Sequence, residues 1–241
     1  INGFIIGTSL GLTSGFTISV AQAYGARKFD KMNKYAGNSI TLAFVIGMVI
    51  MIVAHFLSRP LLKAIDTPDD IIDMSAQYID VLYYAVPIQM SLNNFNALSR
   101  AVGDSKRPLY FLIVSVIVNL LLDILFVGAF KWGVIGAAWA TAISELVAAV
   151  LSAISVLKHT EEYNIDKTAL KIDGKVSWAQ IKIGIPISLQ FSITSIGSMV
   201  LQTAVNGFGS SVIAGFTAAG RVEQLTNIPM SGLGVGNMTF V

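Results

Sequence analysis

The chain has 241 residues, of which 54% are hydrophobic and only 12% are charged, with a formal net charge of +2. A soluble domain carries about 25% charged residues, so this composition indicates a membrane protein. The small net charge argues against nucleic-acid binding, and the lack of cysteine excludes disulfides and argues against a soft-metal site.

Seven apolar segments follow one another along the chain, each near the length of about 20 residues that crosses a bilayer as a helix. A longer charged linker at 158–179 divides the first five from the last two. We therefore predict an all-α integral membrane protein with an N-terminal part at 1–157, this linker, and a second part at 180–241. The predicted segments are 2–24, 35–57, 75–99, 109–130, 133–157, 180–206 and 211–241.

Basic residues are distributed unevenly between the connections. The connections rich in Lys and Arg are 25–34, 100–108 and 158–180. The alternate connections hold only Arg59, Lys63 and Lys131, and one of them is acidic. Because Lys and Arg favour the cytoplasmic side of a membrane, we predict that the first group of connections is cytoplasmic.

The segment at 109–130 contains one charged residue, Asp123. Ser115, Asn119 and Asp123 are spaced four residues apart, so they share one face of a helix. A carboxylate at bilayer depth costs about 2.5–3.5 kcal/mol on insertion scales, and such residues commonly mark ion or proton sites. We therefore predict that Asp123, with the amide of Asn119 one turn away, binds a proton or a cation.

Polar or small side chains also follow single faces of three other segments. Pro87 is expected to kink the 75–99 helix, close to Gln89, Asn93 and Asn96. The 133–157 segment has a stripe of small residues with two larger polar ones beside it: Gly136, Ala140, Ser144, Ala148 and Ser152, then Thr141 and Glu145. The 180–206 segment carries Ser188, Ser192, Ser195, Gln202 and Asn206. Such residues either bridge neighbouring helices or line a cavity, and both interpretations stay open at this point.

The two ends of the chain resemble each other. Gly11, Leu12, Gly15 and Val20 match Gly232, Leu233, Gly236 and Val241 at one constant offset, 232 − 11 = 221. That offset spans six predicted helices, which returns the chain to the same membrane orientation. This fits two parallel six-helix repeats, an arrangement found in two-lobe transporters. We expect the chain to be part of a protein about twice as long.

With the helices placed, the chain resembles the multidrug and toxic compound extrusion (MATE) family of transporters, and looks closest to its bacterial members. The likeness extends along essentially the whole chain. The matching stretches are GLTSGFTISVAQAYGAR (11–27), LSRAVGDSKRPLYF (98–111), NLLLD (119–123), GAAWATAISE (136–145), IKIGIPISLQ (181–190) and AAGRVEQLTNIPMSGLG (218–234). Relative to the family's twelve-helix pattern, we expect the first helix and about the last four to be absent from this sequence.

The resemblance implies two six-helix lobes around a central cavity, with residues 1–157 as the second to sixth helices and 180–241 as the seventh and eighth. It implies a cation site at Asn119 and Asp123 with Asn93 and Thr141, and a further acid on the missing first helix. The expected substrate cavity includes Gln89, Asn96, Glu145, Gln190, Ser192, Ser195 and Gln202. Some members carry an acid on the seventh helix, and this sequence does not support such a site.

The function implied is export of amphipathic, often cationic compounds across a bacterial cytoplasmic membrane, driven by H⁺ or Na⁺. Asp and Asn oxygens suit either ion. We expect no other cofactor, no nucleic-acid partner, and a monomer in the lipid bilayer. The rival in the same superfamily is a lipid-linked oligosaccharide flippase, which would need cationic cavity residues to meet a pyrophosphate. A membrane-embedded enzyme would need a nucleophile with a base, or a metal-ligand cluster, and no such spacing occurs.

Overall fold

The computed structural model describes residues 2–64, 69–158, 163, 165 and 168–206, and short helical stretches between 215 and 234. Within these residues the chain is helical and contains no strand, which confirms the predicted all-α class. The elements are α1 (Asn2–Gly25), α2 (Phe29–Ala64), α3 (Asp69–Ala101), α4 (Lys106–Asp123), the π-helix η1 (Ile124–Ala129), α5 (Gly133–Lys158) and α6 (Gly174–Asn206). The predicted segment at 211–241 lies largely outside the described residues; of its repeat match, Gly232 and Leu233 are described, whereas Gly236 and Val241 are not.

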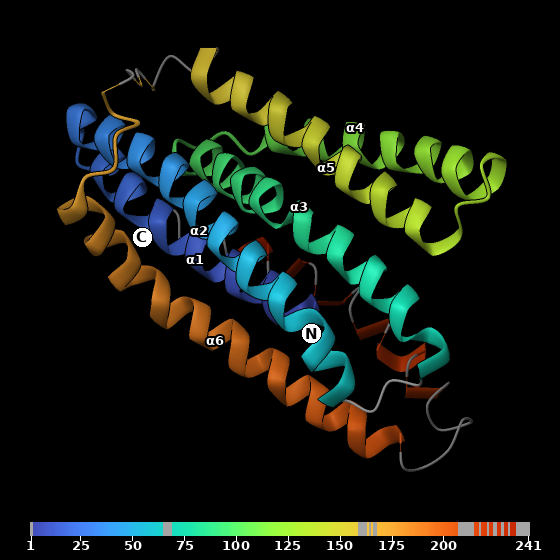
Figure 1. The fold of residues 1–241 in the computed structure, drawn as a ribbon. Helices are drawn as coiled ribbons and strands as arrows, with labels where there is room; N and C mark the ends of the chain where they lie inside the picture. The colour runs from blue at the N-terminus through green and yellow to red at the C-terminus, as the bar shows by residue number, and fades with distance from the viewer. Residues whose placement is uncertain are drawn as a thin grey trace.

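The helices form a layered bundle in which α6 lies on one side and the α4–α5 pair on the other (Figure 1). Helix α1 packs along α6 and also contacts α2 and α3, while α3 packs against α5 and α5 against α4. Three described helices are long and apolar enough to cross a membrane: Phe29–Pro60, Lys106–Ala129 and Gly133–Lys158. Helices α1, α3 and α6 have 24, 33 and 33 residues.

Several helices extend beyond the predicted apolar segments. Helix α2 begins at Phe29 rather than 35, because charged residues such as Lys31 are good helix formers in water. Helix α6 begins at Gly174, inside the predicted linker. There the carboxylate of Asp173 accepts hydrogen bonds from the backbone N–H of Lys175 (2.9 Å) and Val176 (3.3 Å), an N-terminal cap that apolar periodicity does not reveal.

Glycine allows α1 and α6 to approach until their backbones touch. A Cβ added at Gly15 would overlap the backbone of Gly184, and one at Gly11 would overlap that of Ser188. Small residues on facing helices permit such close contact. In a lipid bilayer the hydrophobic effect does not drive helices together, so the dispersion attraction between closely packed atoms stabilises the pair instead. The close α1–α6 contact therefore depends on glycine, which has no side chain, at positions 11 and 15 of α1.

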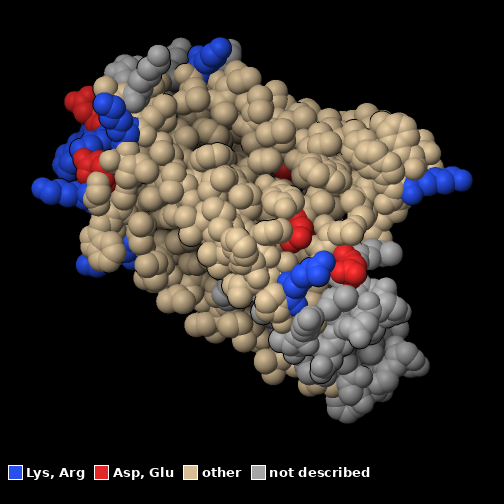
Figure 2. Space-filling view, viewed as in Figure 1, with Lys and Arg blue, Asp and Glu red and all other residues tan. Residues whose placement is uncertain are grey.

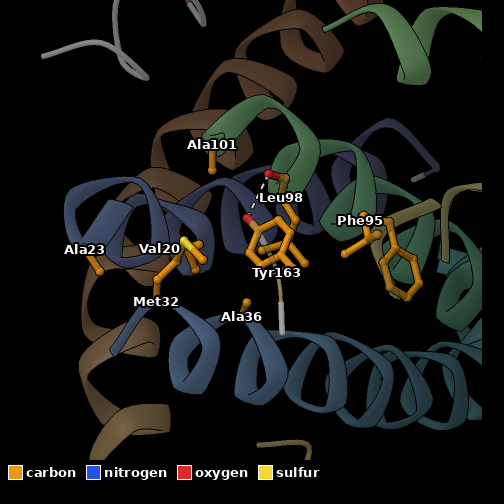
Figure 3. Close-up of a cluster of buried hydrophobic side chains, with 9 residues drawn as sticks. Val20, Ala23, Met32, Ala36, Phe95, Leu98, Ala101 and Tyr163 are labelled. Atoms are coloured by element: carbon orange, nitrogen blue, oxygen red, sulfur yellow. Dashed lines mark hydrogen bonds between the residues drawn. The ribbon is translucent and has the colours of Figure 1, made fainter. Parts of the chain in front are cut away.

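A buried apolar cluster ties the helix ends together at one end of the bundle (Figure 3). Its members come from α1, α2, α3 and α5, and Tyr163 joins them from the connection between α5 and α6. The Tyr163 hydroxyl donates a hydrogen bond to the Leu98 carbonyl at 2.9 Å. Tyr163 is thus held against the bundle by both apolar packing and a buried hydrogen bond. The cluster consists of Val20, Ala23, Met32, Ala36, Phe95, Leu98, Ala101, Val156 and Tyr163.

Charged side chains gather at this same end, where α2 and α6 begin and α3 and α5 end; it is called the basic end below (Figure 2). Its described basic residues are Arg27, Lys28, Lys31, Lys34, Arg100, Lys106, Arg107, Lys158, Lys171, Lys175 and Lys182. At the opposite end the described basic side chains are Arg59 and Lys131. The basic residues, which the sequence concentrates in alternate connections, therefore also lie together at one end of the folded bundle.

Candidate functional site

The two polar residues near the end of α4 are the centre of the candidate site. Asn119 and Asp123 are one helical turn apart and both side chains are partly buried. The Nδ2 atom of Asn119 and the Oδ1 atom of Asp123 are buried and have no hydrogen-bond partner. A buried polar atom without a partner costs about 1–3 kcal/mol, and native proteins satisfy nearly all of them. The pair therefore has a donor and an acceptor available for a ligand.

A change of helix type follows Asp123 directly. Residues Ile124–Ala129 form the π-helix η1, and the Phe130 backbone N–H bonds to the Leu125 carbonyl, five residues back, at 2.9 Å. A π-helical turn contains one residue more than an α-helical turn, and such turns are rare and frequent at functional sites. This is a second observation that singles out the end of α4.

Helix α5 faces the polar side of α4. The Ser115 hydroxyl donates to the Ser144 carbonyl at 3.0 Å, and further along the antiparallel pair a Cβ on Gly136 would lie 3.1 Å from the Cβ of Phe126. Asn119 and Asp123 lie between these two contacts on α4, and Thr141 lies between them on α5. The Thr141 hydroxyl donates to the Ala137 carbonyl at 3.0 Å. Thr141 is thus placed at the level of the pair.

Asn93 lies on α3, which meets α5 extensively and α4 only slightly. Its side chain is partly buried. Among the described residues, no hydrogen bond joins Asn93 to Asn119 or Asp123. The structure therefore places Asn119 and Asp123 side by side on α4, with Thr141 at their level on α5 and Asn93 on the neighbouring layer.

The predicted cavity residues on α3 and α5 pair with polar partners across the contact of these two helices. The Gln89 Nε2 donates to Glu145 Oε1 at 3.2 Å. The Ser152 hydroxyl donates to the Asn96 Oδ1, also at 3.2 Å. Asn96 therefore serves as a bridge between helices, which is one of the two interpretations that the sequence leaves open. Glu145 is a carboxylate in a membrane-length helix with a neutral partner.

Two of the predicted cavity residues on α6, Ser192 and Ser195, lie toward α1, since a Cβ added at Gly7 would be 3.3 Å from the Ser195 hydroxyl oxygen. Ser192 is buried against α1, and its hydroxyl lies 3.0 Å from that of Thr8. The Ser195 hydroxyl donates to the Phe191 carbonyl at 3.0 Å, while Gln190 is exposed. The side chain of Gln202 lies outside the described residues. On α6, Ser192 therefore belongs to the α1–α6 contact.

A buried polar network at the basic end was not predicted from the sequence. Asn38 of α2 donates through Nδ2 to Ser177 Oγ (3.1 Å) and Gln180 Oε1 (2.8 Å), and its Oδ1 accepts from the backbone N–H of Asp173 at 2.9 Å. Gln180 donates to the carbonyls of Phe16 (3.2 Å) and Tyr35 (2.9 Å). Asn38 and Gln180 are both 0% exposed. The network, defined as Asn38, Ser177 and Gln180, fastens the start of α6 to α1 and α2.

An ion pair borders this network. Lys34 Nζ lies 2.6 Å from Asp173 Oδ2, with side chains that are 55% and 34% exposed. The hydrogen bond from Lys34, followed by those from the backbone N–H of Val176 and Lys175, lowers the pKa of Asp173 below its ordinary value. The charged carboxylate is therefore the form that caps α6 and meets Lys34.

A second carboxylate contact lies near the opposite end. His55 Nδ1 on α2 is 3.2 Å from Asp80 Oδ1 on α3, and the imidazole ring lies against Tyr84 with centroids 5.8 Å apart. The two atoms are close, but both also lack a hydrogen bond of acceptable geometry. Because a hydrogen bond requires a suitable angle as well as a short distance, the imidazole and the carboxylate are in contact here without a hydrogen bond.

Comparison with known proteins identifies the chain's relatives. The sequence profile described as MatE matches residues 1–125. The chain belongs to the MatE family. The probable multidrug resistance protein YoeA of Bacillus subtilis is 30% identical over 98% of this chain and 52% of its own length. The multidrug export protein MepA of Staphylococcus aureus (strain MRSA252) is 24% identical over 98% of this chain and 52% of its own length.

Solved structures agree with this family assignment. A crystal structure of a MATE protein in complex with MaD3S superposes with a TM-score of 0.90 at 25% identity, covering 98% of this chain and 54% of that one. An outward-facing structure of a multidrug resistance MATE family transporter also superposes on this chain, with a TM-score of 0.89 at 24% identity. At this identity the likeness shows the fold alone. The chain spans about half the length of the MATE relatives that it matches.

Proposed function

We propose that the complete protein is a cation-coupled exporter of amphipathic, often cationic compounds, and that Asp123 carries the coupling cation with the help of Asn119. The observation that carries the proposal is the pair of unpartnered buried atoms, Asn119 Nδ2 and Asp123 Oδ1, at the end of α4. The names of the relatives, which are multidrug resistance and export proteins, support the substrate class. The coupling ion is H⁺ or Na⁺.

The chemistry follows from what a carboxylate can do at this position. Burial disfavours its charged form, while a proton or a bound Na⁺ removes the unfavourable charge. If the loaded and empty forms prefer different conformations, cation binding and substrate binding are coupled through that equilibrium alone. Asn119 would supply an amide oxygen or N–H to the same ligand, since either orientation of the amide is available. Thr141, at the same level on α5, would contribute its hydroxyl.

The charge distribution favours an exporter of cations over a flippase for anionic lipid-linked sugars. The described acids within the helices include Asp123 and Glu145, whereas the described basic side chains lie toward the two ends (Figure 2). A pyrophosphate needs Arg or Lys in the cavity, because these residues form charge-assisted hydrogen bonds with phosphate oxygens.

Transport by the full-length protein in proteoliposomes tests the proposal, with pH and Na⁺ gradients imposed separately. Asp123→Asn keeps size and hydrogen-bonding capacity but removes the titratable group, so gradient-driven efflux should be nearly abolished while expression and folding stay normal. Asn119→Ala should weaken coupling less, and Asp30→Asn, at an exposed acid on α2, is the matched control. Wild-type efflux by Asp123→Asn under both gradients would refute the assignment.

We also propose that the basic end faces the cytoplasm of a bacterial cell and that the complete protein works as a monomer. The positive-inside tendency supports the orientation. In intact cells, single cysteines at the exposed positions Lys31 and Lys171 should resist impermeant thiol reagents, and one at Lys131 should react. The reverse labelling pattern would contradict this orientation.

A further inference from the structure

A second carboxylate–amide pair lies within the bundle, on a different face of α5 from the contact with α4. Glu145 of α5 accepts a hydrogen bond from Gln89 of α3 at 3.2 Å, and both side chains are partly buried. Glu145 is one helical turn from Thr141, so the two share a face of α5. The neighbouring residue Ser144 is bonded through its carbonyl to Ser115 of α4. Helix α5 therefore stands between the Gln89–Glu145 pair and the Asn119–Asp123 pair.

No described cation neutralises Glu145. Helix α3 has no titratable side chain within one turn of Gln89 in either direction; its nearest charges are Asp80 and Arg100, nine and eleven residues away along the helix. Helix α4 contributes Asp123 as its only charge after Arg107, and η1 contributes none. On α5 itself the next charge is Lys158, at the helix end. At about 1.5 Å of rise per residue, these separations exceed ion-pair distance along each helix.

The partner that Glu145 does have can accommodate two protonation states. An amide donates through N–H to a carboxylate, and after a half-turn about its last bond it accepts through oxygen from a carboxylic acid. Gln89 can therefore keep one hydrogen bond to Glu145 whether or not the proton is present. A Na⁺ ion would need several oxygen ligands, and within the described part of the chain the side chain that is hydrogen-bonded to the carboxylate is that of Gln89. The chemistry of the pair suits a proton.

We propose that Glu145, held by Gln89, is a second proton-binding site of this lobe, separate from Asp123. The proposal rests on the proposed transport function only where it assigns the bound proton a role in transport. Proton binding at Glu145 itself can be measured on this chain without a transport assay. Gln89 is a positioning residue in this arrangement, because it acts on the proton through the Glu145 carboxyl group.

The test is infrared difference spectroscopy between acid and alkaline pH on the chain reconstituted in lipid. A carboxylic acid within an apolar bundle gives a C=O stretching band distinct from that of acids in water. We expect one such pH-dependent band to vanish in Glu145→Gln and to remain in Asp123→Asn and in Asp30→Asn. In Gln89→Ala the same band should move to higher frequency, because the carbonyl loses its hydrogen bond.

Each outcome decides the proposal independently of transport. Identical spectra from the wild type and a folded Glu145→Gln overturn it, and so does a band that disappears only in Asp123→Asn. If circular dichroism shows that Glu145→Gln does not fold, Gln89→Ala replaces it, and an unmoved band in that variant overturns the proposal. If Asp123→Asn does not alter efflux, the proposed coupling role of Asp123 is refuted. That result does not affect the proton site at Glu145, which these spectra test separately.

Discussion

At the basic end, Asn38 and Gln180 are 0% exposed and every side-chain donor and acceptor of the two amides has a partner. Near the end of α4, Asn119 and Asp123 are only partly buried, yet each has a buried atom with no partner. The two amides at the basic end are thus completely satisfied, whereas Asn94, which donates to Ser39 between α3 and α2, keeps a buried oxygen without a partner. The contrast teaches that fully paired amides hold the start of α6 in place, whereas the end of α4 keeps buried polar atoms unpaired.

The largest effect should come from filling the glycine contact next to the satisfied network. Gly15→Ala places a Cβ onto the Gly184 backbone, so α1 and α6 must separate, and we expect the loss of about 3 kcal/mol or more of stability. Gly128→Ala is the matched control, because nothing lies within 4 Å of its Cβ position in η1. Unfolding of the chain in detergent, followed by circular dichroism, measures both. Equal effects at the two glycines would show that the α1–α6 contact is looser than described.

Truncating an amide in each region compares them directly. Asn38→Ala leaves Gln180 Oε1 and the Asp173 N–H without a partner, and should cost about 2–3 kcal/mol. Asn119→Ala removes a buried donor that has no partner and should change stability by less than about 0.5 kcal/mol. The same unfolding measurement applies. A loss in Asn119→Ala as large as in Asn38→Ala would indicate a structural partner for Asn119.

Removing the charge of Asp123 should leave the fold at least as stable as before. Asp123→Asn replaces a membrane carboxylate by a neutral group of the same shape, so we expect a gain of up to about 1 kcal/mol. Unfolding of this variant at neutral pH checks the prediction. A clear loss of stability would mean that Asp123 holds the fold together, and would remove the contrast between the two regions.

The smallest effect concerns pH and the Lys34–Asp173 ion pair. Because the folded pKa of Asp173 is lowered, its stabilising contribution is complete above its unfolded pKa of about 3.9 and is lost as pH falls through the lower folded value. Asp173→Asn keeps an oxygen to cap α6 but cannot titrate, so its stability should depend less on pH in this acid range. Unfolding midpoints between about pH 2 and 5, compared with those of Asp30→Asn, measure the difference. Parallel curves would contradict the role assigned to Asp173.

The sequence predicted features that follow from local spacing. The helical class came from apolar length, and the shared face of Asn119 and Asp123 from their four-residue separation. The network could not be predicted, because Asn38 meets Ser177 and Gln180 across 139 and 142 residues. The pairing of Gln89 with Glu145, 56 residues apart, depends equally on how α3 and α5 pack. The start of α6 was missed because a polar cap precedes its apolar run.

The π-helix after Asp123 makes the orientation of this side chain sensitive to a one-residue deletion. Its extra residue sets the angle between the polar face of α4 and the stacked rings of Phe126, Phe130 and Trp132 that follow. Deleting one residue from η1 would restore an α-helical turn and rotate one side relative to the other by about 100°. The direction of Asp123 relative to these rings therefore depends on the number of residues in η1. An in-frame deletion of one codon there would turn the carboxylate relative to the rings without changing Asn119 or Asp123.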